Sequence, residues 1–383
     1  MIYIGRYPDT AVAEYKKYIE RKVDKELQRD IVRLLNKDIE ATKVKKVLNF
    51  EELITMDFIR LKSIYFNLKS TNKIKKIKKD INYFEKIRDG ELAKIKKDIN
   101  YFEKIRDGEL AKIKKDINCF ETIGDEELAE KKNNEKKYIK MIYKSIILRL
   151  KEDLDILKRS ETFKKSEILT RYKKKYSVYT EERERGKGKK NNIELSKALR
   201  LTVCPYCNRS FINNRGDRES GRQFDHFFSK DEMPYFALSL YNLVPSCSTC
   251  NHTKSTHEMK CCPFDKEFEI DRKLKFIVDL ISGKITVKKT VPDVKILKLD
   301  EAYEIHSVDV KRLFDAEKKY CQEYRNNLLK KIDPKEHFLL SEQWFDQMIF
   351  GDAVYLDHTK SRNEPLSYLK YDTYQMIKKY RKK

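Results

Sequence analysis

Four of the eight cysteines in this chain form two C-x-x-C pairs, Cys204 with Cys207 and Cys247 with Cys250. Each pair can present two thiolates to one ion, and four thiolates make a closed tetrahedral zinc site with no position left for water. We therefore expect a structural zinc ion that fastens the ends of the segment between the pairs, because metal binding is coupled to folding. An iron–sulfur cluster is the alternative for the same ligands.

Other side chains between and just after the cysteine pairs suit a second kind of chemistry. They are Asp225, His226, Asn242, Asn251 and Lys254. An imidazole with an ordinary pKa of about 6.5 can accept a proton from water at neutral pH. Carboxylate and carboxamide oxygens are ligands for hard divalent cations. Each residue alone has a common structural role. Only their combination with the two C-x-x-C pairs, each of which can form a zinc knuckle, indicates catalysis.

Short elements must position these residues. Residues 209–212 and 222–228 can pair as a hairpin, with His226 at the end of the second strand. Asn242 falls on the following loop, and residues 248–257 can form a helix that carries Asn251 and Lys254. Together these elements make a ββα unit.

This segment resembles an HNH endonuclease of the His-Me finger superfamily, in the variant with zinc knuckles. The matching residues are Asp225-His226, Asn242 and Asn251, followed by Lys254. Two further stretches, 262–265 and 364–369, are similar to HNH proteins of bacterial anti-phage defence systems, such as the nuclease subunit of Septu.

The resemblance implies a ββα-metal nuclease that hydrolyses phosphodiester bonds in nucleic acid. His226 would be the general base that activates water, and Asn242 would orient its imidazole. Asp225 and Asn251 would hold one catalytic divalent ion, Mg²⁺ or Mn²⁺, in addition to the structural zinc.

Three more residues have roles that the resemblance suggests. The family often has histidine where this chain has Asn251, so His257, which lies close by, is the fallback ligand for the catalytic ion. Lys254 would contact the phosphate, and Arg222 could do so from the hairpin.

The chain has 383 residues and can hold two or three domains. We expect a mainly α protein in which a small α+β core contains the nuclease module. Residues 1–180 would form a helical, basic arm, with apolar residues at helical spacing already within 10–70. Residues 181–200 would be a linker and lead-in helix, 201–270 the nuclease module with its zinc knuckles, and 271–383 an α+β region with strands at 274–278 and 284–290.

Residues 76–129 contain three copies of an 18-residue repeat, of which the first two are identical and the third keeps 14 positions. At about 100° per residue, each copy makes about five full turns and returns the same apolar stripe to the same face. Gly90 and Gly108 each weaken the helix by about 1 kcal/mol relative to alanine. The repeats either lengthen a helical arm by tandem duplication or form a helix that binds a partner or makes a homo-oligomer.

The net charge is +23, and most of the excess lies in the first 200 residues. A basic region beside a cysteine cluster favours a nucleic-acid partner, with double-stranded DNA preferred, over a merely solvated lysine-rich surface. Residues 171–176 interleave aromatic with cationic side chains, as surfaces that follow a nucleic-acid backbone do, or they form one solvated face of a helix. The chain shows no signal-peptide layout and no stretch that could span a bilayer, so we expect a cytoplasmic protein without a membrane partner.

Three functions fit these features. The first is a metal-dependent HNH endonuclease, acting as an effector of phage defence. The second is a non-catalytic zinc-knuckle protein that binds nucleic acid, which would have no need for the Asp-His and Asn combination. The third is a nuclease subunit that a partner ATPase or sensor switches on.

Overall fold

The computed structural model describes residues 2–40, 42, 44–87, 89–90, 93–122, 126–159, 161–181, 195, 197–215, 220–267, 274–288, 293–331 and 342–381. Within these ranges the chain is mainly helical and has two two-stranded sheets, which confirms the predicted mainly α chain with a small β part. None of the helices in these ranges is long and apolar enough to cross a membrane.

The chain folds as two compact units. The first contains Met1–Ser70 and Tyr172–Lys383, and the second contains Thr71–Arg171. This division differs from the predicted boundaries, because residues 1–70 share a unit with the cysteine pairs and not with the repeats. Most of the predicted linker, namely residues 182–194 and 196, lies outside the described residues.

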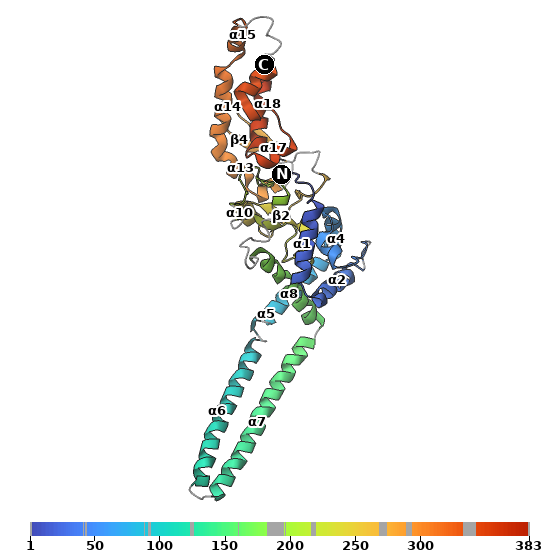
Figure 1. Cartoon of the computed structure of the whole chain (residues 1–383), viewed down its shortest axis with the longest axis vertical. Coiled ribbons are helices and arrows are strands. Elements are labelled where there is room, and N and C mark those ends of the chain that lie inside the picture. The colour runs from blue at the N-terminus through green and yellow to red at the C-terminus, as the bar shows by residue number, and fades with distance from the viewer. Residues whose placement is uncertain are drawn as a thin grey trace. The chain divides into compact units, whose positions relative to one another are not determined.

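The chain begins with the helices predicted within residues 10–70. They are α1 (Asp9–Lys22), α2 (Lys25–Ile39), α3 (Phe50–Thr55) and α4 (Phe58–Ser70) (Figure 1). Side chains cap three of them: Asp24 accepts a hydrogen bond from the backbone N–H of Leu27, Asn49 accepts one from that of Glu52, and Asp57 accepts one from that of Arg60. Such caps satisfy amides that have no partner within the first turn of a helix.

These helices pack against the segment between the cysteine pairs. The Phe58 ring stacks on that of Phe228 with centroids 5.6 Å apart, and the Tyr65 ring lies 4.1 Å from the same phenylalanine. The Tyr15 hydroxyl donates to the Leu238 carbonyl at 2.8 Å. Residues 1–70 therefore supply part of the core around the candidate site and do not form an arm.

A short hairpin followed by a helix lies at the centre of the first unit. Strand β1 (Gln223–His226) pairs antiparallel with β2 (Leu243–Ser246), and α10 (Ser248–Lys254) follows β2. Two 3₁₀ turns, η2 (Pro234–Phe236) and η3 (Leu240–Asn242), lie between the strands. The elements thus follow one another in the order β, β, α.

The predicted pairing of residues 209–212 with 222–228 is wrong. Residues 210–212 fold back on the first cysteine pair: the Cys204 amide donates to the Ser210 carbonyl at 2.9 Å, and the Ile212 amide donates to the Thr202 carbonyl at 2.7 Å. The backbone groups of residues 210–212 thus hydrogen-bond to the segment around the first cysteine pair. Strand β1 pairs with the later strand β2 instead.

The rest of the first unit is a small α+β assembly. Strands β3 (Phe276–Val278) and β4 (Ile285–Val287) pair antiparallel, within the two stretches predicted as strands. The helices that follow are α12 (Asp293–Ile296), α13 (Leu299–Tyr303), α14 (Ser307–Lys319), α15 (Gln322–Leu329), α16 (Glu342–Phe350), α17 (His358–Asn363) and α18 (Ser367–Arg381). Phe314, Phe350 and Tyr374 belong to a hydrophobic core that joins α14, α16 and α18.

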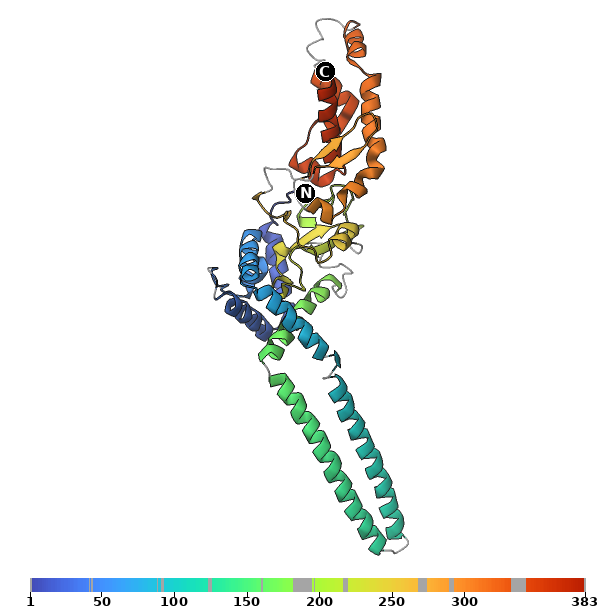
Figure 2. The same cartoon turned by 180° about the vertical axis from the view of Figure 1, so that it is seen from behind.

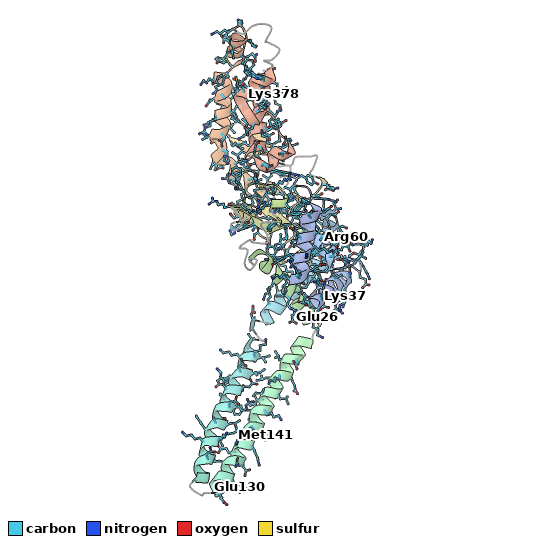
Figure 3. All side chains as sticks on the ribbon, in the orientation of Figure 1. Glu26, Lys37, Arg60, Glu130, Met141 and Lys378 are labelled. Atoms are coloured by element: carbon cyan, nitrogen blue, oxygen red, sulfur yellow. The ribbon has the colours of Figure 1, made fainter. Side chains whose placement is uncertain are left out.

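The second unit is built around a helical hairpin that contains the repeats. Helix α5 (Lys73–Ile87) leads to α6 (Ala93–Thr122), and α7 (Glu126–Arg159) runs back beside α6 (Figures 1 and 2). Ile99 of α6 packs with Ile147 and Leu154 of α7. Met141, labelled on α7 in Figure 3, is exposed. Helix α8 (Glu161–Glu181) follows, and its residues from Tyr172 onward belong to the first unit.

Gly90 and Gly108 hold the same position in the first two repeat copies. In the first copy Gly90 lies between the bounds of α5 and α6, and its own backbone is π-helical. In the second copy Gly108 lies inside α6. A Cβ atom added at either glycine would meet nothing within 4 Å.

We predict that Gly108→Ala stabilises α6. Alanine removes the helix penalty of glycine, which is about 1 kcal/mol at an exposed interior position, and the space beside Gly108 is open. Hydrogen exchange at the amides of α6 should become slower, as mass spectrometry of the intact chain would show.

Gly283→Ala is the matched control, for which we expect a loss of stability and not a gain. Gly283 has a φ of +75°, and an added Cβ would lie 2.9 Å from the Ser307 carbonyl oxygen. The alanine should therefore destabilise the turn between β3 and β4. Unchanged or faster exchange in α6 of the Gly108→Ala chain would contradict the first expectation.

Candidate functional site

Four cysteine side chains meet in the first unit. The sulfur atoms of Cys204, Cys207, Cys247 and Cys250 all lie within 4.8 Å of one another, and all four residues are buried. A tetrahedral zinc ion with Zn–S bonds of about 2.3 Å needs sulfur atoms about 3.8 Å apart. The cluster could therefore hold a zinc ion, as the sequence predicts.

Burial and the neighbouring sulfurs shift the pKa values of these thiols. Burial raises the pKa of Cys204 well above its usual value. Hydrogen bonds from the other three thiols hold the pKa of Cys247 far below its usual range. A bound cation would favour the deprotonated form of all four sulfurs.

Asn208 connects the first cysteine pair to the C-terminal part of the unit. Its backbone has a φ of 54°, and its amide donates to the Cys204 carbonyl at 2.8 Å. Its side chain donates to the Ser361 carbonyl at 3.0 Å and accepts from the Tyr368 amide at 3.0 Å. The segment 364–369 therefore packs on the first cysteine pair.

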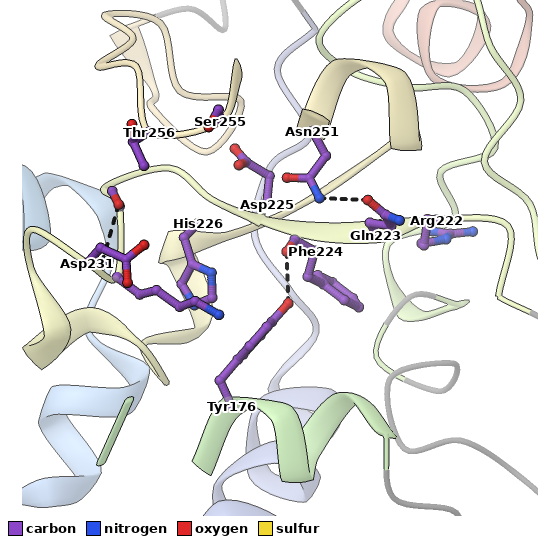
Figure 4. A pocket seen from close by; sticks show the side chains of 12 residues that line it. Tyr176, Arg222, Gln223, Phe224, Asp225, His226, Asp231, Asn251, Ser255 and Thr256 are labelled. Carbon is purple, nitrogen blue, oxygen red and sulfur yellow. Dashed lines mark hydrogen bonds between the residues drawn. The ribbon is translucent and has the colours of Figure 1, made fainter. Parts of the chain in front are cut away.

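A cavity of about 510 Å³ lies along β1 (Figure 4). Successive side chains of a strand point to opposite faces. Gln223 and Asp225 lie on the side of α10, whereas Phe224 and His226 lie on the side of α8. Side chains from both faces line the cavity, so it brings together Asp225, His226 and Asn251.

His226 is buried in its neutral form. Its Nε2 lies 2.9 Å from the Ala237 carbonyl oxygen. A carbonyl can only accept, so Nε2 carries the proton and Nδ1 has the free lone pair. Burial lowers the pKa of His226 to about 3. This is well below the ordinary value expected from sequence, because the surrounding protein replaces the water that would stabilise the imidazolium.

The side chain of Asn242 hydrogen-bonds to backbone groups and not to the His226 imidazole. Its Oδ1 accepts from the Phe228 amide at 2.8 Å, and its Nδ2 donates to the carbonyls of Phe228 and Phe236 at 3.0 and 3.1 Å. The orienting contact expected for Asn242 is thus made by the Ala237 carbonyl. Asn242 braces the backbone that carries this carbonyl.

Both carboxylate oxygens of Asp225 accept hydrogen bonds from buried side chains. The Tyr206 hydroxyl donates to Oδ2 at 2.6 Å, and Lys254 Nζ donates to Oδ1 at 3.1 Å. Burial raises the pKa of Asp225, and these two partners oppose that shift. Lys254 Nζ also donates to the His226 carbonyl at 2.7 Å.

Lys254 does not occupy the place predicted for it. Its side chain is fully buried and is not part of the cavity wall. A contact between its ammonium and a phosphate in the cavity is therefore not available in this structure. Its partners assign it a different task, which is to hold Asp225.

Gln223 orients the amide of Asn251. The Asn251 Nδ2 donates to the Gln223 Oε1 at 2.7 Å, and the Oδ1 points toward Asp225 (Figure 4). Asp225 and Asn251 thus offer two oxygen atoms to a cation. The fallback ligand His257 does not line this cavity, and its Nδ1 lies 2.9 Å from the Lys254 carbonyl.

Tyr176 and Lys230 complete the wall beside His226. The Tyr176 ring centroid lies 4.3 Å from that of His226, and its hydroxyl donates to the Phe224 carbonyl at 2.8 Å. The Lys230 ammonium lies 4.9 Å from the Tyr176 ring centroid. No local pattern links Tyr176 to β1, whereas Gln223 shares a strand face with Asp225 and could have been found from the alternation of side chains.

Comparisons of the chain with models of protein families, with curated proteins and with solved structures found no match. The function is therefore inferred from the side chains around the cavity and the cysteine cluster.

We predict that the purified chain contains zinc and that Cys250→Ala loses it. Structural zinc contributes about 10–16 kcal/mol to the folding of small zinc-binding peptides, so the variant should also unfold at a lower temperature. Elemental analysis and thermal unfolding measure the two effects.

Cys262→Ala is the matched control, because Cys262 is equally buried but lies outside the sulfur cluster. This variant should keep its zinc. Equal zinc loss in both variants would mean that the four sulfurs do not form the binding site.

Proposed function

We propose that the chain is a metal-dependent endonuclease of the HNH type, which hydrolyses phosphodiester bonds in nucleic acid. One observation supports this most: a neutral imidazole and two oxygen donors, from His226, Asp225 and Asn251, line the same cavity. A proton acceptor beside a cation site is the arrangement that metal-assisted hydrolysis requires.

In this proposal His226 is the general base. The Ala237 carbonyl fixes the proton on Nε2. The Nδ1 lone pair can then take a proton from a water molecule as that water attacks phosphorus. Tyr176 packs against the imidazole and limits its rotation.

Asp225 and Asn251 are the proposed ligands of the catalytic ion. A carboxylate and a carboxamide oxygen fit a hard cation such as Mg²⁺ or Mn²⁺, which keeps several waters. Each Asp225 oxygen accepts one hydrogen bond in the structure and retains lone-pair capacity. A cation bound there would stabilise the negative charge that develops on the phosphate during hydrolysis.

Positive charge near the cavity favours a polyanionic substrate, for which we propose double-stranded DNA. Lys230 and Arg222 both line the cavity. Burial lowers the pKa of Arg222 to about 10, so this side chain is still cationic at neutral pH. Asp231, an acidic residue of the same wall, is paired with Lys173 at 3.0 Å.

A zinc-knuckle protein that only binds nucleic acid is the competing function. It would use the charge and the cysteines but would gain nothing from a neutral buried histidine next to two oxygen ligands. The presence of Mg²⁺-dependent strand cleavage separates the two functions.

We predict that His226→Ala abolishes Mg²⁺-dependent nicking of a supercoiled plasmid. Loss of a general base lowers the rate by about 10²–10⁴-fold. The zinc content and the circular dichroism spectrum should stay unchanged. His226→Gln, which fills more of the buried space, provides a second chain if the alanine variant folds poorly. Full nicking by a folded variant without the imidazole would rule out the proposed base.

We also predict that Asn251→Ala raises the Mn²⁺ concentration needed for half-maximal nicking by at least about 10-fold. The substitution removes one of the two proposed oxygen ligands. His257→Ala is the matched comparison and should leave this concentration unchanged. The reverse result, with His257→Ala impaired and Asn251→Ala normal, would assign the ligand role to His257.

A further inference from the structure

The two side chains that hold Asp225 come from the two different cysteine pairs. Tyr206 lies inside the first pair, between Cys204 and Cys207. Lys254 lies on α10, the helix that also carries Cys250. Their hydrogen bonds reach opposite oxygens of the same carboxylate.

Each donor is rigidly attached to its knuckle. Tyr206 is fully buried, and the next residue but one, Asn208, closes the knuckle turn through the Cys204 carbonyl. On the other side, Cys250 and Lys254 are four residues apart on one helix, and such residues lie on the same face. Cys247 caps this helix by accepting from the Cys250 amide.

A zinc ion bound to all four sulfurs would fix the distance between the two knuckles. It would therefore fix the distance between the Tyr206 hydroxyl and the Lys254 ammonium. This distance sets where the Asp225 carboxylate lies and how it is turned toward Asn251.

We propose that Tyr206 is a positioning residue through which the zinc site controls the catalytic cation site. Its hydroxyl, together with Lys254, orients Asp225 so that the carboxylate and Asn251 can bind one divalent ion. This inference rests on the proposed function, because it assumes that Asp225 is a ligand of that ion.

The hydroxyl can serve this purpose because it can only donate to the carboxylate. The Oδ2 of Asp225 keeps a further lone pair for the cation while it accepts from Tyr206. Groups that orient a metal ligand in this way typically contribute 10-fold to 100-fold to metal affinity.

Mn²⁺ binding to the zinc-loaded full chain, followed by electron paramagnetic resonance without substrate, tests the proposal. Tyr206→Phe removes the hydroxyl and keeps the buried ring, so zinc content and thermal unfolding should change little. The dissociation constant for Mn²⁺ should rise by about 10-fold to 100-fold. Asp225→Asn should bind Mn²⁺ more weakly still.

Tyr303→Phe is the matched control. Tyr303 is also fully buried, and its hydroxyl donates to the Cys207 carbonyl at 2.5 Å. This variant loses a tyrosine hydroxyl on the same knuckle without changing a contact to Asp225, so its Mn²⁺ affinity should equal that of the unmodified chain.

The outcomes distinguish the positioning role of Tyr206 from the existence of the cation site. If Asp225→Asn weakens Mn²⁺ binding and Tyr206→Phe does not, the positioning role is wrong and the cation site stands. Equal weakening in Tyr206→Phe and Tyr303→Phe would also overturn it, because the effect would then be general loosening of the knuckle. If the unmodified chain binds no Mn²⁺ at this site, both the inference and the proposed catalytic ion fail.

Discussion

The candidate site in the first unit depends on the cluster of four buried sulfur atoms. Strands β1 and β2 have four residues each. A two-stranded sheet of this size is at best marginally stable alone. The sulfur cluster connects the segment before β1 to the helix after β2, so a metal there would hold the ββα elements in register. The aromatic contacts from α4 add the apolar burial that so small a sheet cannot provide.

Burial then determines the chemistry of the side chains on β1. Removing water makes the imidazolium form of His226 costly, so the imidazole stays neutral. The same burial would be costly for the Asp225 carboxylate without its two donors. Removing one partner of a buried ion pair typically costs about 3–5 kcal/mol, because the other charge is left uncompensated. Lys254 is thus needed for the fold of the site, and for this reason it cannot also be a mobile phosphate ligand.

The sequence was sufficient for whatever depends on local spacing. The cysteine pairs, the first helices and α10 follow from spacing and periodicity, and they are where they were expected. The partner of β1 was not predictable, since residues 209–212 and 243–246 are both plausible strands and only the folding of the first knuckle excludes the former. The packing of Tyr176 on His226 and of Phe58 on Phe228 joins residues far apart in the chain. Asn242 lies between β1 and β2, on the connection where it was expected. Its hydrogen bonds depend on the conformation of that connection, which residue spacing does not encode.

The repeats show the same limit, because the contacts of the repeated apolar side chains depend on a partner helix that the repeat does not specify. Glu103 of α6 pairs with Lys151 of α7 at 3.2 Å. Equal steps along antiparallel helices place the start of α6, about ten residues earlier, opposite the end of α7. Gly108 lies opposite the middle of α7, where contacts such as that between Glu109 and Tyr143 maintain the helix. The repeat decides which side chains share a face of α6, whereas α7 decides which of these side chains are buried, as the packing of Ile99 against Ile147 shows.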